Sequence, residues 1–222
     1  MENARNLFAT FALSVGLLTV TGANAALESA LGGQVVNDTD LNITWLADAN
    51  LAATETFGVS GINANGTMTW NTAQSWIGAM NASNYLGFND WRLPTSLSPV
   101  GSSCTGYLCS GSEMGHLYYF EGGLNGQSIA SSSILNEYFT GMQSDNYWNY
   151  EYAPLLDSAW SFSGANGWQN VYPSTNEYFA WAVRSGEVVS AVPEPQTYGM
   201  LLTGLAVIGF TMNRRKQSFT AV

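Results

Sequence analysis

Two arginines are the only basic residues in the long central part of this chain, and they are the first candidates for chemistry. Between residues 26 and 192 the sequence holds fourteen acidic residues against Arg92 and Arg184, which leaves a formal charge of −12. A guanidinium presents a rigid planar fork that grips a carboxylate by two hydrogen bonds. Each arginine could therefore bind an anionic sugar or sulfate, or form an internal bridge to an aspartate such as Asp90 or Asp157. We favour the internal bridge and keep both arginines as candidate ligand-binding residues.

Aromatic residues crowd one segment and indicate a second kind of chemistry, the stacking of rings on sugars. Eight of them lie within twenty-six residues: Tyr147, Trp148, Tyr150, Tyr152, Trp160, Phe162, Trp168 and Tyr172. An exposed flat ring can stack on the apolar face of a sugar while neighbouring Asn and Asp side chains read its hydroxyls. Aromatic side chains also suit a half-buried sheet, so we expect at most two or three of the eight to be exposed. Trp148, Tyr150 and Trp168 are taken as the candidate ligand-binding residues.

Turn aspartates offer oxygen ligands of the kind that calcium prefers. Six lie in or near expected turns: Asp38, Asp40, Asp48, Asp90, Asp145 and Asp157. The densest stretch, residues 37–40, lacks the glycine and the distant glutamate of an EF-hand loop. Ordinary turn chemistry explains the same residues equally well. Bound calcium is therefore possible, no other cofactor is expected, and the residues that would hold a metal are left unknown.

Catalysis finds little support in the residues. His116 is the only histidine, and it lies in an expected helix, where a lone histidine is more often packed than catalytic. The chain contains no G-x-S-x-G elbow and no H-E-x-x-H motif. A carboxylate pair for glycoside hydrolysis stays open, because its geometry is three-dimensional. We therefore expect no enzyme activity and no catalytic residues, with a hydrolase as the rival interpretation.

The two cysteines, Cys104 and Cys109, lie five residues apart. In an exported protein such a pair favours a local disulfide, which pins one surface loop and constrains little chain. The alternative is a metal site, but it would need further ligands, and the chain offers only His116. We expect the disulfide.

The elements that must position these residues form an α+β pattern. Residues 32–37 and 41–46 are expected to be two strands joined by a turn at Asp38-Thr39-Asp40. Four further β segments are expected in the second half of the chain: residues 146–152, 159–163, 168–172 and 178–184. Asn71 or Thr72 can cap a helix whose apolar stripe is Ala73, Trp76, Ile77 and Met80. Ser112 can cap a second helix, although Gly115 weakens it.

The N-terminal end has the pattern of a signal peptide. Arg5 precedes the apolar stretch Leu7–Val20, and Ala23-Asn24-Ala25 forms an A-x-A cleavage site. We therefore assign residues 1–25 to a signal peptide and residues 26–190 to one exported domain. The acidic composition of that domain excludes nucleic acid as a partner.

The C-terminal end has the pattern of a sorting signal. Pro193-Glu194-Pro195 precedes an uncharged apolar run at 198–212 and the basic cluster Arg214-Arg215-Lys216. The run is long enough for a short transmembrane helix, and the basic cluster should stay in the cytoplasm. Residues 191–222 closely resemble the PEP-CTERM sorting signal. That resemblance implies a Gram-negative bacterial protein, an exosortase as a partner, an inner-membrane intermediate held by the helix before processing, and delivery to the cell surface or extracellular matrix.

A second resemblance covers the domain. The segments Ile43–Asn50, Met68-Thr69-Trp70, Asp90–Thr95 and Ala180–Arg184 occur in the same order in the Lcl C-terminal domain family, which is found on bacterial secreted and surface proteins. The stretch Trp91–Thr95 also resembles formylglycine-generating-enzyme-like domains and implies their C-type-lectin-like fold. The chain lacks the acidic continuation after Thr95 and the late cysteine pair that carries that enzyme's copper chemistry, so the resemblance argues against that activity.

These observations together predict an exported surface or matrix protein with a single C-type-lectin-like domain. We expect a non-catalytic role in adhesion or polysaccharide binding, with exopolysaccharide as the partner. A hydrolase acting on exopolysaccharide and a structural matrix protein without a ligand are the alternatives. An exposed aromatic strip in a shallow groove would favour the binder, whereas two carboxylates facing each other across a cleft would favour the hydrolase.

Overall fold

The structure is a computed structural model that describes residues 26–153, 157–189 and 203. The predicted signal peptide and almost all of the predicted sorting signal, including Pro193-Glu194-Pro195 and the basic cluster, lie outside the described residues. So does the predicted helix 198–212, apart from Thr203. In the part of the chain that is described, no helix is long and apolar enough to cross a membrane.

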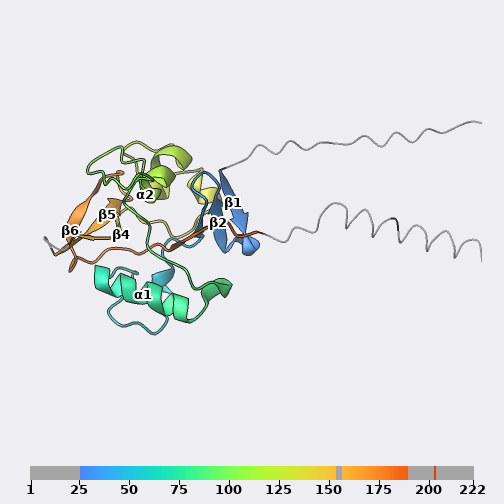
Figure 1. Ribbon diagram of the computed structural model, residues 1–222, viewed down its shortest axis with the longest axis horizontal. Coiled ribbons are helices and arrows are strands. Elements are labelled where there is room, and N and C mark those ends of the chain that lie inside the picture. The colour runs from blue at the N-terminus through green and yellow to red at the C-terminus, as the bar shows by residue number, and fades with distance from the viewer. Residues whose placement is uncertain (1–25, 154–156, 190–202, 204–222) are drawn as a thin grey trace, which may run out of the picture.

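Two antiparallel sheets lie at opposite ends of the domain (Figure 1). The first has the strand order β1-β2-β3-β7, with β1 Leu27–Ala30, β2 Val35–Asp38, β3 Ile43–Leu46 and β7 Val183–Ser185. The predicted hairpin is confirmed, and an aspartate fixes its turn, because the Leu41 N–H donates to the Asp38 carboxylate at 3.1 Å. Pairing of β3 with β7 brings the beginning and end of the domain into one sheet.

The second sheet contains three of the predicted β segments. Its strands are β4 Asn146–Ala153, β5 Ser158–Ser163 and β6 Gln169–Pro173, in that order. The pairing of β4 with β5 shifts register between Trp148 and Tyr152, which marks a bulge. Bulges redirect side chains on the bulged strand. The prediction of a mixed, strand-rich domain with two helices is confirmed.

Helix α1, Trp70–Ala82, carries the predicted apolar stripe, and all four of its residues are buried. Its cap differs from the prediction. The helix begins earlier, at Thr69, whose extended backbone lets the side-chain oxygen accept from the Thr72 N–H at 3.3 Å. Thr72 was a predicted cap, but its backbone is helical and it donates to the cap instead.

Helix α2, Glu113–His116, is capped by Ser112 as predicted. A Cβ on Gly115 would lie 2.0 Å from the carbonyl oxygen of Cys109. The glycine that weakened the prediction is therefore required, because the helix backbone packs directly onto the cysteine loop. Helix α2 runs into a π-helical turn, η4 Leu117–Glu121.

Short 3-10 turns make up most of the remaining regular structure in the described part of the chain. They are η1 Leu31–Gly33, η2 Leu51–Ala53, η3 Tyr85–Gly87, η5 Ile129–Ser131 and η6 Leu135–Glu137.

The predicted strand 178–184 is wrong for most of its length. Only Val183–Ser185 forms a strand, and residues 179–182 are all buried. The segment runs between the two sheets instead of joining one. Phe179 exchanges backbone hydrogen bonds with β4, and the Ala182 carbonyl accepts from Leu46 of β3 at 3.0 Å. The alternating sequence predicts that every second side chain is exposed, but residues 179–182 are all buried because the protein covers the segment on both sides.

An aromatic cluster forms the centre of the core around Trp181. Its ring centroid lies 5.1 Å from that of Trp45 and 5.0 Å from that of Phe139. Trp91 is also buried, at 2% exposure, and its indole N–H donates to the Tyr85 carbonyl at 3.1 Å. Asn81 of α1 pairs with both the N–H and the carbonyl of Trp91, so the Trp91 segment is attached to α1.

The predicted disulfide is confirmed. Cys104 and Cys109 are bonded, with their Cα atoms 5.4 Å apart. The bonded sulfurs cannot serve as metal ligands. Gln169 of β6 also holds this loop, because it exchanges backbone hydrogen bonds with Gly106 and its side chain donates to the Cys104 carbonyl at 2.9 Å.

Replacing both cysteines by alanine should therefore lower the free energy of unfolding by less than the ~2–5 kcal/mol typical of a native disulfide. The bond closes a short loop that Gln169 already holds. Thermal melts of the purified protein measure the loss. Intact mass after alkylation should show no free thiol in the wild type, and two alkylated thiols in natively exported protein would contradict the disulfide.

Candidate functional site

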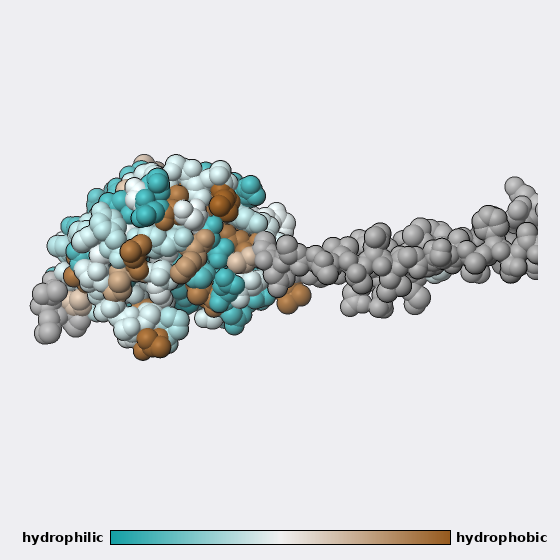
Figure 2. Space-filling model, turned by 90° about the horizontal axis from the view of Figure 1, so that it is seen from above, coloured by the Kyte–Doolittle hydropathy of each residue, from teal (hydrophilic) through white to brown (hydrophobic). Residues whose placement is uncertain are grey.

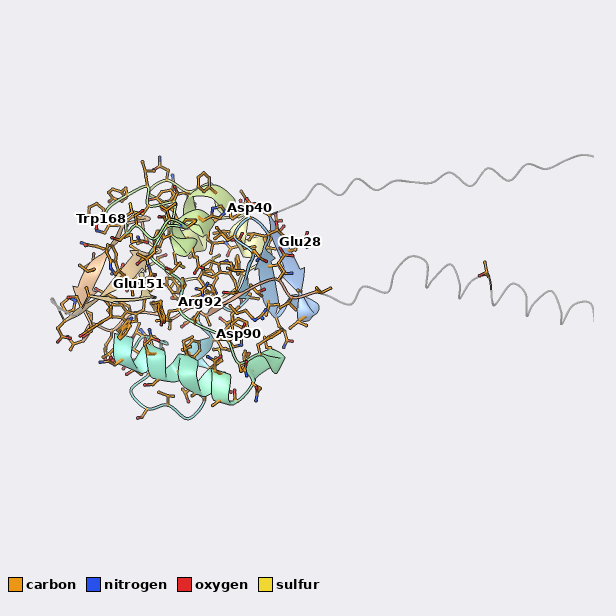
Figure 3. All side chains as sticks on the ribbon, viewed as in Figure 1. Glu28, Asp40, Asp90, Arg92, Glu151 and Trp168 are labelled. Atoms are coloured by element: carbon orange, nitrogen blue, oxygen red, sulfur yellow. A yellow bond between two sulfur atoms is a disulfide. The ribbon has the colours of Figure 1, made fainter. Side chains whose placement is uncertain are left out.

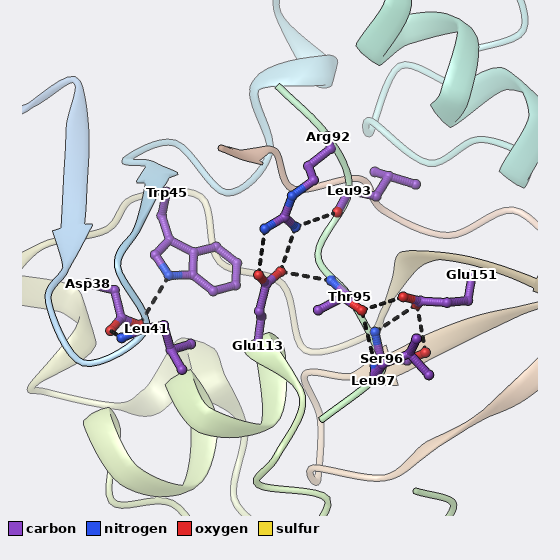
Figure 4. A network of polar contacts seen from close by, with 10 residues as sticks. All are labelled: Asp38, Leu41, Trp45, Arg92, Leu93, Thr95, Ser96, Leu97, Glu113 and Glu151. Carbon is purple, nitrogen blue, oxygen red and sulfur yellow. Dashed lines mark hydrogen bonds and ion pairs between the residues drawn. The ribbon is translucent and has the colours of Figure 1, made fainter. Parts of the chain in front are cut away.

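An ion pair between Arg92 and Glu113 lies between the two ends of the domain (Figure 4). The two guanidinium nitrogens donate to the two carboxylate oxygens at 2.7 and 2.6 Å. The side chains are 28% and 11% exposed. Burial alone would lower the pKa of Arg92, but the hydrogen bonds and charge of Glu113 outweigh it and raise that pKa. Arg92 therefore has an internal partner, although the partner is a glutamate that the sequence did not indicate.

The same glutamate and a second one, Glu151, hold the chain that follows Arg92. Glu113 accepts from the Thr95 N–H at 2.8 Å. Glu151 accepts from the N–H and the hydroxyl of Ser96, both at 2.7 Å, and from the Thr95 hydroxyl. Residues 95–96 are thus fixed from both sides by carboxylates.

The two glutamates open onto different clefts. Glu113 lines a cleft of about 360 Å³ together with Leu41 and Leu97, whereas Glu151 lines a separate groove. Residues 95–96 hydrogen-bond to both and lie between them (Figure 4). This pair therefore does not form the arrangement of two carboxylates across one cleft that would favour a hydrolase.

Arg184 has the internal partner that the sequence suggested. It donates to the two carboxylate oxygens of Asp90 at 2.8 and 3.0 Å, and its guanidinium carbon lies 4.2 Å from the centroid of the Phe88 ring. The other suggested partner, Asp157, bonds to Tyr152 and Ser174 instead. Both arginines of the domain are therefore paired within the described structure.

The three candidate aromatic residues do not come together. Trp148 is fully buried, so its proposal as a ligand-binding residue is wrong: its ring lies 4.7 Å from that of Tyr178, and its indole N–H donates to the Met68 carbonyl at 2.8 Å. Trp168 is half-buried and lies well away from Arg92 (Figure 3), packing edge-on against Tyr107 at 4.7 Å. Tyr150 is 54% exposed.

Tyr150 lines a shallow groove between the start of α1 and strand β4, with a volume of about 520 Å³. Trp70 and Gln74 line it from α1, and Tyr150, Glu151 and Tyr152 line it from β4. We call this set the aromatic groove. The rings of Trp70 and Tyr152 are stacked, with centroids 5.0 Å apart and planes 25° apart.

Polar groups accompany these rings in the aromatic groove. The indole N–H of Trp70 donates to the Asn149 carbonyl at 2.9 Å, which fixes the ring. The side-chain nitrogen of Gln74 is buried and finds no hydrogen-bond acceptor among the described residues. Groove and rings together can hold a flat apolar ligand face, and Glu151 lines the same groove.

Sequence reasoning missed Trp70 and Gln74 as site residues. Trp70 lies three and seven residues before Ala73 and Ile77, so its spacing continues the buried stripe of α1. Periodicity alone therefore assigns Trp70 to the core. Its position opposite β4 depends on how α1 packs against the second sheet, which no local pattern reveals.

The turn aspartates mostly have local partners. Asp48 and Asp145 accept from backbone N–H groups within two residues of themselves, and Asp90 pairs with Arg184. Among the residues that the structure describes, one group of three side chains could share a metal ion: Asp38, His116 and Glu121. The lone histidine is packed, as expected, and its ring nitrogen lies 3.2 Å from a Glu121 oxygen.

Arg92→Lys should lower the free energy of unfolding by about 1–3 kcal/mol, because a lysine cannot reproduce the two-pronged pairing with Glu113. For a domain of this size each kcal/mol corresponds to about 2–4 °C in melting temperature. Arg184→Lys is the matched control. Its partner Asp90 is 47% exposed, so its loss should be smaller. Equal melting temperatures of wild type and Arg92→Lys would contradict a structural role for the pair.

Two known families match the sequence. Residues 34–184 match the Lcl C-terminal domain, and residues 191–216 match the PEP-CTERM protein-sorting motif. No curated protein and no solved structure matches the chain. PEP-CTERM motifs direct proteins of Gram-negative bacteria to export and to the cell surface or extracellular space, with processing by an exosortase. Because the first match covers more than half of the sequence, this exported chain belongs to the Lcl C-terminal domain family.

Proposed function

We propose that this domain is a non-catalytic polysaccharide-binding module of the cell surface or extracellular matrix, and that the aromatic groove is its binding site. The observation that carries the proposal is the stacked pair Trp70–Tyr152 beside the exposed ring of Tyr150. An exposed aromatic strip in a shallow groove is the feature that favours a binder over a hydrolase. The described structure has such a strip, built from residues 150–152 and the first turn of α1.

The chemistry of the aromatic groove suits a sugar chain. Tyr150 and Tyr152 are 54% and 39% exposed, so each offers ring surface on which the apolar face of a sugar can stack. Glu151 lines the same groove and can accept a hydrogen bond from a hydroxyl. A volume of about 520 Å³ lies within the range of small-ligand sites.

Charge supports a neutral ligand rather than an anionic one. Fourteen acidic residues face two arginines between residues 26 and 192, and both arginines are paired internally. A polyanion would be repelled by the domain. We therefore expect a neutral polysaccharide in the groove, and we no longer place an anionic sugar on Arg92 or Arg184.

The hydrogen bonding of the glutamates supports the non-catalytic interpretation. Glu113 is neutralised by Arg92, and Glu151 accepts three hydrogen bonds from Thr95 and Ser96. The two carboxylates of a glycoside hydrolase must face one cleft, whereas these two are engaged in internal hydrogen bonds and open onto different clefts. The hydrolase is therefore the less favoured alternative.

The surface of the domain supports display in water. Figure 2 shows hydrophobic side chains on one face as separate patches among hydrophilic ones. Scattered apolar residues are normal for a soluble domain, whereas a large contiguous patch would indicate a docking face. A purely structural role without a ligand remains the outcome if the groove binds no glycan.

We also infer the finer points of fold and route that the family implies. Support for the C-type-lectin-like fold comes from Trp91–Thr95, the segment that resembles lectin-like domains, because it hydrogen-bonds to both Asn81 of α1 and Glu113 of α2. The route runs through an inner-membrane intermediate held by the apolar run 198–212, with processing near Pro193-Glu194-Pro195. The order of the motif, apolar run and basic cluster supports it.

Tyr150→Ala should weaken binding to a neutral polysaccharide about tenfold, the equivalent of about 1.4 kcal/mol, because it removes one stacking surface. A glycan array identifies the ligand, and titration calorimetry measures the affinity. Anionic polysaccharides in the same array should bind more weakly than neutral ones.

Tyr107→Ala is the matched control, because Tyr107 is 55% exposed and packs against Trp168 away from the aromatic groove. It should bind as the wild type does. Loss of binding in Tyr107→Ala with normal binding in Tyr150→Ala would move the site to Trp168 and overturn the proposal. Binding to no glycan at all would leave the structural role.

A further inference from the structure

Three acid–base side chains from distant parts of the sequence meet beside the first sheet. Asp38 ends β2, His116 ends α2, and Glu121 ends the π-helical turn. One ligand atom from each lies within 4.8 Å of the other two. The His116 ring nitrogen lies 3.2 Å from a Glu121 oxygen and 3.9 Å from an oxygen of Asp40, which Figure 3 shows on the α2 side of the first sheet.

The π-helical turn is what brings the histidine and the glutamate together. They lie five residues apart, and in an α-helix residues five apart point about 140° away from each other. A π turn closes its hydrogen bond over five residues, as the Gly122 N–H does to the Leu117 carbonyl at 2.9 Å. Residues five apart then lie much closer to the same side of the helix. Such turns are rare and are often found at functional sites.

The negative charge of this cluster exceeds the positive charge near it. Asp38, Asp40 and Glu121 surround one imidazole, so even a protonated His116 leaves two negative charges. The arginines of the domain are both paired elsewhere.

Asp38 in particular is a buried carboxylate with spare acceptor capacity. Asp38 as a whole is 0% exposed to solvent. One oxygen accepts from the Leu41 N–H at 3.1 Å, and the other lies 3.5 Å from the Trp45 indole nitrogen, at the limit of a hydrogen bond. A carboxylate can accept about four hydrogen bonds, and leaving a buried one so poorly satisfied is costly. A cation at this point would satisfy it.

We propose that Asp38, His116 and Glu121 bind one divalent metal ion of the zinc class. Imidazole nitrogen with carboxylate oxygen suits zinc and its neighbours, whereas calcium takes oxygen ligands alone. Two ligand atoms at about 2.1 Å from a tetrahedral zinc lie about 3.4 Å apart, close to the 3.2 Å between His116 and Glu121. The ion would tie the β2–β3 hairpin to α2 and η4.

The site is independent of the polysaccharide proposal, because no residue of the aromatic groove takes part in it. Its role would be structural, joining an element of the first sheet to the helix that begins at Glu113. Metal binding of this kind stabilises the folded state, since the unfolded chain holds no preformed site.

Titration of the full-length purified chain, stripped with a chelator, tests the proposal. Zinc chloride should bind one ion per chain in calorimetry and raise the melting temperature by several degrees, whereas calcium and magnesium chloride should raise it far less. Glu121→Gln and His116→Gln should each weaken zinc binding about tenfold or more, because each removes one of three ligands. Glu137→Gln, on the short turn η6, is the matched control and should bind zinc as the wild type does.

The single histidine gives a second readout on the unaltered protein. His116 is the only histidine in the chain, so its modification by diethyl pyrocarbonate reports on this site alone. Saturating zinc should block that modification. Full modification of His116 in the presence of zinc, or the same zinc affinity in His116→Gln as in the wild type, would overturn the proposal. So would the absence of any zinc-dependent shift in melting temperature, whether or not the variants fold.

Discussion

The two-pronged ion pair between Arg92 and Glu113 is the interaction on which the rest of this domain depends. Arg92 exchanges backbone hydrogen bonds with Val183 at 2.8 and 2.9 Å, so the cation is fixed to the first sheet. Glu113 starts α2 and also accepts from Thr95. Three regions of the chain that share no secondary structure are therefore joined at one pair of charges. With few cations in an acidic domain, the pairing that each arginine makes has large consequences for the fold.

One short segment of the chain connects the Arg92–Glu113 pair to the aromatic groove. Thr95 and Ser96 pass from Glu113 to Glu151, and the Pro94 carbonyl accepts from the Tyr150 N–H at 2.8 Å. The outer edge of β4 is held by this segment where its register against β5 is broken. The backbone that carries the ring of Tyr150 is therefore held by Pro94. A preorganised ring loses less freedom when a ligand binds, which favours affinity.

Local sequence patterns predicted the features that depend only on interactions between neighbouring residues. The stripe of α1, the Ser112 cap, the β2–β3 turn and the short disulfide each follow from neighbouring residues, and each is present. The cap of α1 lies at Thr69 instead of Asn71 or Thr72, and the other predictions that failed depend on distant contacts. The segment 179–182 alternates like a strand but is buried on both sides, because it runs between two sheets.

The candidate site was less predictable than the fold for the same reason. Trp148 and Tyr150 are two residues apart on one strand, yet one is in the core and the other is exposed, because a bulge intervenes. Trp70 has core spacing and lines a groove. The pairing of Arg92 with Glu113 spans twenty-one residues and could not be chosen from among fourteen acidic residues without the fold. The meeting of His116 with Glu121 requires a π turn, for which the sequence has no clear signal.

A double-mutant cycle on the central ion pair tests this account most directly. The free energy of unfolding would be measured for wild type, Arg92→Met, Glu113→Gln and the double variant. Removing one partner of a buried pair leaves a charge uncompensated and typically costs about 3–5 kcal/mol. If the pair joins these regions, the double variant should lose about 1–3 kcal/mol less than the sum of the two single losses, which is the coupling energy of two residues in contact. Losses that simply add, with coupling below about 0.5 kcal/mol, would show that the pair does not hold these regions together.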